Sequence, residues 1–124
     1  MCGRGDFFAI IDEMPDTSYL GEFELQVMLI VIRLGEEAYG VPISREIKER
    51  TGRNVAFATV YSTLERLQRK GLVNSQLGDP SPERGGRAKR YFRVTKAGLE
   101  AVREAKRNLV RLWHGLRELE GGVA

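Results

Sequence analysis

Hydroxyl and guanidinium groups gather on one side of the segment between Phe57 and Lys70. The apolar residues Val60, Leu64 and Leu67 follow the spacing i, i+4, i+7, which predicts a helix that buries these three side chains together. The outward face then carries the residues Ala58, Thr59, Tyr61, Ser62, Glu65, Arg66 and Arg69. Hydroxyls donate and accept hydrogen bonds, and guanidinium groups hold anionic oxygens. This face therefore suits a polar, negatively charged ligand.

The positive charge of the chain is concentrated in its middle. The 124 residues have a formal net charge of +3, but residues 1–41 hold two basic and eight acidic side chains. Residues 42–95 hold twelve basic and five acidic side chains, a net charge of +7. A localised positive field is what a surface that binds a polyanion requires. Residues 42–95 are therefore the candidate region for such a surface.

The chain has few of the residues that catalysis or metal binding requires. Cys2 is the only cysteine and His114 the only histidine, so one protomer can assemble neither a disulfide nor a Cys/His metal cluster. A histidine-centred base and a phosphate-cradling glycine loop at a strand-to-helix turn are also missing. We therefore expect no enzymatic activity, no metal site and no cofactor.

The apolar runs are too short for a membrane protein. The longest unbroken run, Val27 to Ile32, is far shorter than the roughly 20 residues that a membrane-spanning helix needs. The first six residues begin no apolar stretch that ends in a small-residue cleavage site, as a secretory signal would. We expect a protein of the cytoplasm that does not enter a membrane.

Three helices are predicted in the first part of the chain. Residues 21–34 are apolar on nearly all sides, as in a buried helix, and Gly21 can serve as its N-cap with Glu24 three residues on. Residues 39–42 open a second helix that Gly52 ends, because glycine readily adopts the conformation found just after a helix. The segment from Phe57 to Lys70 forms the third.

After Gly71 the period changes from helical to alternating. Residues 73–77 and 90–94 alternate in polarity around a long loop, which predicts a two-stranded hairpin with a basic, glycine-containing tip. Thr95 can cap a last helix that runs to Gly122. The fold class is then mostly α with a small β-hairpin, a winged helix-turn-helix followed by a long C-terminal helix. We divide the chain into an N-terminal arm (1–19), the winged helix-turn-helix domain (20–95) and a dimerisation helix (96–122).

A winged helix-turn-helix presents its third helix to the major groove of double-stranded DNA, where base edges can be distinguished. Thr59, Tyr61 and Ser62 are the residues that we expect to contact bases, and Arg66 and Arg69 those that hold flanking phosphates. In the hairpin tip, Gly86, Arg87 and Lys89 suit the sugar-phosphate backbone or a narrow minor groove. Taken alone, this tip is equally consistent with a solubilising loop, but its position beside a basic helix favours a DNA contact.

Several linked motifs resemble one family of DNA-binding proteins. The similar stretches are residues 38–40, Ile47, 51–52, 58–67, 70–73 and 85–98. In this order they resemble PadR-type transcriptional regulators with a single C-terminal helix. The resemblance implies a homodimer held by its C-terminal helices, which binds operator DNA and usually represses transcription.

Individual residues carry this resemblance. Tyr61 matches the tyrosine of the family's third helix, and Gly86, Arg87 and Tyr91 match its wing. Two features depart from the family pattern. Ala56 stands where a serine or threonine often caps the third helix, and the arm before residue 20 is longer than the family minimum.

The last helix predicts dimerisation independently of the resemblance, because its apolar side chains repeat every seven residues. One row contains Val102, Leu109 and Leu116, and a second contains Ala105, Leu112 and Leu119. We therefore expect an interface that includes the residues Val102, Leu109, Leu112, Trp113 and Leu116. Trp113 could instead line a pocket for a small-molecule effector between protomers, since ligand sites favour aromatic walls.

The sequence thus predicts a sequence-specific DNA-binding transcriptional regulator, a repressor that acts as a homodimer on a near-palindromic operator. The alternative is a winged-helix protein-interaction module that does not bind DNA. The net charge of +7 in residues 42–95 favours the first reading, because an interaction module needs no basic hairpin beside a basic helix.

Overall fold

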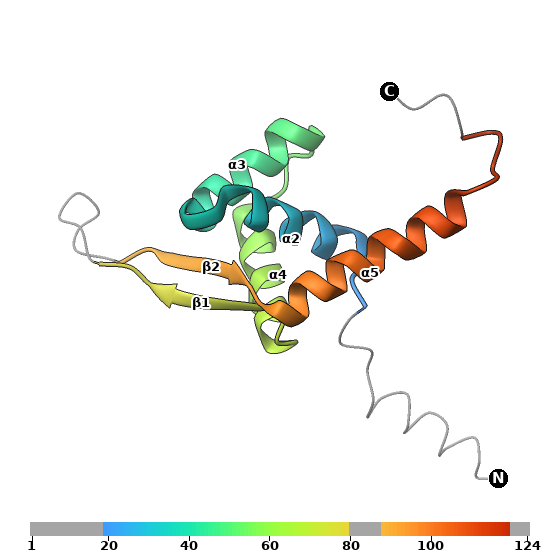
Figure 1. The fold of residues 1–124 in the computed structure, drawn as a ribbon. Helices are drawn as coiled ribbons and strands as arrows, with labels where there is room; N and C mark the ends of the chain where they lie inside the picture. Colours follow the sequence, from blue (N-terminus) through green and yellow to red (C-terminus); the bar gives the residue numbers. More distant parts are fainter. Residues whose placement is uncertain (1–18, 80–87, 120–124) are drawn as a thin grey trace, which may run out of the picture.

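The computed structural model describes residues 19–79 and 88–119, and over these residues it shows a helical body with one hairpin (Figure 1). The elements are, in order, α2 (Glu22–Leu34), η1 (Gly35–Glu37), α3 (Gly40–Thr51), α4 (Phe57–Arg69), β1 (Val73–Leu77), β2 (Arg90–Val94) and α5 (Lys96–Trp113). This order confirms the predicted class, a mostly α fold with a small hairpin arranged as a winged helix-turn-helix.

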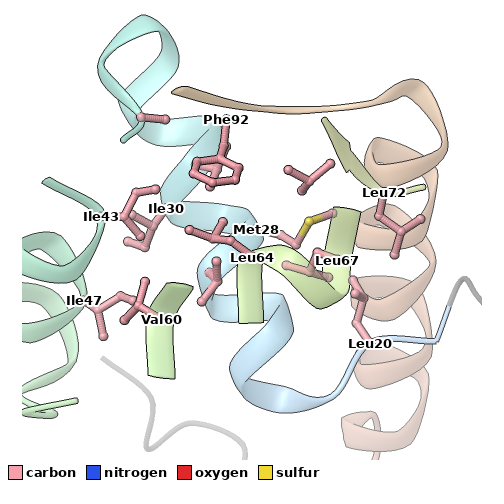
Figure 2. Packing of buried hydrophobic residues seen from close by; sticks show 14 of the residues in the cluster. Leu20, Met28, Ile30, Ile43, Ile47, Val60, Leu64, Leu67, Leu72 and Phe92 are labelled. Carbon is pink, nitrogen blue, oxygen red and sulfur yellow. The ribbon is translucent and has the colours of Figure 1, made fainter. Parts of the chain in front are cut away.

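The core lies where α2, α3, α4 and β2 meet (Figure 2). The trio predicted to point inward from α4, Val60, Leu64 and Leu67, is fully buried. Met28 of α2 and Phe92 of β2 are the largest buried side chains that pack with them. Because α4 contributes a whole face to this core, the opposite face of the helix is fixed in its outward orientation.

Local sequence explains where the helices begin and end. The Gly21 backbone N–H donates to Glu24 Oε1 at 2.9 Å, which is the predicted start of α2. Gly52 follows α3 in the left-handed conformation with φ 76°, which favours glycine. The Gly98 N–H donates to Thr95 Oγ1 at 3.0 Å and so caps α5. Ala56 makes no side-chain cap, as expected, and α4 begins without one.

The two strands of the hairpin pair with each other, and β2 also bonds to the residues just before α3. β1 and β2 pair in antiparallel register, with Val73 opposite Val94 and Leu77 opposite Arg90. From within β2, the Phe92 N–H donates to the Ala38 carbonyl at 2.8 Å. Backbone hydrogen bonds thus connect the base of the wing to the residues that lead into α3. The tip residues 80–87 lie outside the described part of the chain.

The last helix is shorter than predicted. α5 ends at Trp113, so the expectation that it runs to Gly122 is wrong. His114 has φ −60° and ψ 133°, Gly115 has φ 84°, and the Leu116 N–H donates to the Trp113 carbonyl at 3.1 Å. These values describe a type II turn, which favours glycine at its third position. Gly115 therefore ends a repeat that the heptad pattern alone would continue.

Neither a membrane-spanning helix nor a metal-binding cluster occurs within residues 19–79 and 88–119. Their helices are not long and apolar enough to cross a membrane. Over the same ranges, no group of three His, Cys, Asp or Glu side chains could hold a metal ion. The exposed surface of α3, α4 and the base of the wing is instead rich in hydroxyl, amide, aromatic and cationic side chains.

Candidate DNA-binding surface

The outward face of α4 carries most of the polar groups predicted for it. Thr59 and Ser62 are exposed near the start of the helix, and Arg69 is exposed at its end. The Ser62 hydroxyl donates to the Thr59 carbonyl at 3.1 Å, a contact within the helix that leaves the serine oxygen able to accept another hydrogen bond. These three residues are thus placed where a groove-bound helix would need them.

Tyr61 is only partly exposed, which corrects the prediction that it points fully outward. Its ring packs edge-on against Phe92, with centroids 6.1 Å apart, and stacks on Phe57 at 6.2 Å. On the helical wheel, position 61 lies next to the buried Leu64 at the edge of the buried face, so a large ring there covers the edge of the core. The predicted base contact of Tyr61 stays a prediction.

Arg66 makes an ion pair within the chain that the sequence analysis did not predict. Its Nε donates to Glu24 Oε2 at 2.8 Å, and Lys70 Nζ donates to Glu24 Oε1 at 2.9 Å. Glu24 is only 6% exposed, so this carboxylate connects α2 to the end of α4. Arg66 is therefore paired with a buried acid through its Nε, while its side chain is 47% exposed; the phosphate contact predicted for it stays a prediction.

The surroundings of Glu24 favour its charged form. Burial alone would raise the pKa of this carboxyl group. Hydrogen bonds from Arg66, the Gly21 N–H and Lys70 outweigh burial, and the pKa is lowered below its ordinary value. Sequence reasoning missed this cluster because Glu24 and Lys70 are far apart in the chain, and the only local signal was an acid within an otherwise apolar helix.

Of the wing residues predicted to contact DNA, Lys89 lies in the described part of the chain. Lys89 Nζ lies 4.0 Å from the centroid of the Tyr39 ring, a cation–π contact at the start of α3. Arg90 Nη1 donates to Ser75 Oγ at 2.9 Å across the hairpin. The predicted residues Gly86 and Arg87 lie outside the described residues.

The start of α3 adds polar groups that the sequence analysis did not single out. An open hollow of about 310 Å³ lies between α3 and the start of α4. It is lined by Val41, Ser44, Arg45, Lys48, Asn54, Val55 and Phe57. Arg45 and Lys48 were part of the counted excess of positive charge, but only the fold brings them next to α4.

The outer half of α5 exposes a row of apolar side chains. Leu109, Leu112 and Trp113 are 51%, 74% and 40% exposed, and Leu116 beyond the helix is also exposed. Val102, which we predicted for the same interface, is half-buried and packs against the core of its own chain. Leu109, Leu112 and Trp113 line a groove of about 960 Å³ between α5 and the start of α2, which Tyr19 and Leu25 line from the other side.

Comparisons with known proteins agree with this geometry. Residues 28–104 match the model of the Transcriptional regulator PadR-like family. The chain is 37% identical over 86 residues to Transcriptional regulator Rv3488 of Mycobacterium tuberculosis, an overlap of 69% of this chain and 73% of that one.

Solved structures show the same fold. A PadR-like regulator from Bacillus cereus has a TM-score of 0.64 at 21% identity, covering 93% of this chain and 99% of that one. A PadR family regulator from Eggerthella lenta has a TM-score of 0.60 at 25% identity, covering 95% and 98%. With its winged helix-turn-helix and a family match from α2 into α5, the chain belongs to the PadR-like family of transcriptional regulators.

Proposed function

We propose that this regulator is a homodimeric repressor that binds a near-palindromic operator. The observation that carries the proposal is the exposed start of α4, where Thr59 and Ser62 follow a hollow that Arg45 and Lys48 of α3 also line. A helix fits the major groove, and residues at its N-terminal end reach the base edges. In this proposal residues 20–95 bind DNA, with Arg69 and Lys89 holding phosphates beside Arg87.

The dimer in this proposal forms through α5. Leu109, Leu112 and Trp113 expose an apolar face that the described residues 19–79 and 88–119 leave uncovered, and covering it with a second copy removes that surface from water. A twofold dimer would place two copies of α4 in successive major grooves, about 34–36 Å apart. The operator would then be an inverted repeat, and occupying it would block transcription.

The groove beside Trp113 supports a second function, the binding of an apolar effector. Its volume of about 960 Å³ lies within the range of small-molecule sites. Trp113 is the only tryptophan, so its fluorescence reports on the groove directly. Quenching of this signal by an anilinonaphthalene sulfonate dye, lost in Tyr19→Glu on the side of the groove opposite α5, would support an effector site; equal quenching in both proteins would contradict it.

Selection of bound duplexes from a random DNA pool tests the main function. An enriched inverted repeat with half-sites about one helical turn apart is the expected result. Sedimentation of the enriched complex should then give two protomers per duplex. A purified monomer with no measurable affinity for duplex DNA at low salt would contradict the proposal and favour a protein-interaction module.

A further inference from the structure

Two large apolar side chains are exposed where the two helices of the helix-turn-helix begin. Phe57 is the first residue of α4 and is 49% exposed, and Val41 in the first turn of α3 is 50% exposed. Both line the hollow between the two helices, together with Ser44, Arg45, Lys48, Asn54 and Val55. Adjacent apolar groups inside a polar rim are typical of an interaction site.

The Phe57 ring is held in a defined position. It stacks on Tyr61 with centroids 6.2 Å apart and an interplanar angle of 24°, and Tyr61 in turn packs against the buried Phe92. The ring also lies against Gly40, since a Cβ at that position would be only 2.6 Å from the ring. The absence of a side chain at Gly40 thus makes room for Phe57. A ring supported in this way loses little conformational freedom when a ligand binds.

The charges around the ring favour nucleic acid over an apolar protein partner. Arg45 and Lys48 lie on the same rim and would oppose burial in an apolar interface, whereas they attract phosphates. In the major groove, the C5-methyl of thymine is the one methyl group that a standard base pair presents, and phenylalanine is among the side chains that contact it. The first turn of α4 is also the part of the helix that reaches bases.

We propose that Phe57 is a specificity-determining residue that recognises a thymine methyl group in each half-site. This inference rests on the proposed DNA-binding function. It assigns the apolar part of the readout to Phe57, while Thr59 and Ser62 make hydrogen bonds.

Replacing thymidine by deoxyuridine tests the inference, because the exchange removes only the methyl group. Each thymine of an enriched duplex is replaced in turn, and the dissociation constant is measured for the full-length protein. At one thymine per half-site we expect wild-type affinity to fall about fourfold, the effect of one buried methyl group. The Phe57→Ala variant should bind both duplexes equally and match the weakened value.

Matched variants separate this effect from general damage. Phe57→Leu keeps an apolar side chain and should retain part of the preference for thymine. Arg69→Ala should weaken both duplexes equally, since a phosphate contact does not depend on the base. A wild-type protein that binds an enriched duplex but tolerates deoxyuridine at every position would overturn the inference and leave the proposed function intact. An unchanged thymine preference in Phe57→Ala would overturn it equally, as would association of Phe57 with a protein instead of DNA.

Discussion

The helices α4 and α5 both leave the same core, yet they expose opposite kinds of surface. α4 presents hydroxyls and cations, and the outer half of α5 presents Leu109, Leu112 and Trp113. Water can solvate the first surface, but only another apolar surface can cover the second. The comparison teaches that one small body separates a polar, basic face from an apolar one, which the proposed function assigns to DNA and to a second copy of the chain.

The largest expected effect comes from making the α5 face polar. Leu109→Glu combined with Leu112→Glu should yield a folded monomer, because neither side chain belongs to the core. Affinity for the operator should fall about 10²–10⁴-fold, since a dimer gains this factor by engaging two half-sites at once. Sedimentation and titration with the enriched duplex measure both changes. Arg111→Glu adds a carboxylate outside the groove and should leave both properties near wild type; a dimeric double variant would contradict the division of faces.

The inner half of α5 should respond in stability rather than in assembly. A Cβ at Gly98 would lie 2.1 Å from the Leu72 carbonyl oxygen, so Gly98→Ala must displace backbone. We expect unfolding to become easier by about 3 kcal/mol in urea denaturation. Lys106→Ala on the exposed half serves as the control and should change stability by less than about 0.5 kcal/mol. Equal effects would show that both halves of α5 are anchored alike.

Glu24→Gln tests how firmly the end of α4 is held. We expect the free energy of unfolding to fall by about 2 kcal/mol at neutral pH, because hydrogen bonds to charged groups contribute about 1.5–3 kcal/mol. Because folding lowers the pKa of Glu24, its charged form stabilises the fold fully above the unfolded pKa of about 4.3. This stabilisation is lost as the pH falls through the lower pKa of the folded state. Denaturation at several pH values should therefore show the variant and wild type converging in acid, whereas the exposed neighbour Glu22→Gln should change little.

The smallest effect is expected for a single phosphate contact on the polar face. Arg69→Ala should weaken operator binding about fivefold and reduce the salt slope by about one, uniformly across sequences. Arg66→Ala should change the salt slope less, because Glu24 already engages this guanidinium. Titrations at several salt concentrations decide between them, and an equal loss of slope would mean that Glu24 releases Arg66 to DNA.

Local patterns predicted the helices, the hairpin and their caps, because spacing along the chain determines which side chains share a face. Contacts between residues that are far apart in the chain were not predicted. The pairing of Glu24 with Arg66 joins two helices, and the partial burial of Tyr61 depends on Phe92 across the core. The end of α5 was missed for a different reason: the leucine repeat continues past the turn at His114 and Gly115, where the backbone leaves the helical conformation.

The backbone hydrogen bond from Phe92 to Ala38 has a consequence for how a duplex is recognised. β2 is bonded to the residues before α3, and the rings of Tyr39 and Tyr91 pack with centroids 5.4 Å apart. Moving the base of the hairpin away from the helices would therefore break both contacts. A binding surface that changes shape little favours duplexes whose bend and groove width already match it. The stiffness of the DNA then contributes to which sequences the protein prefers.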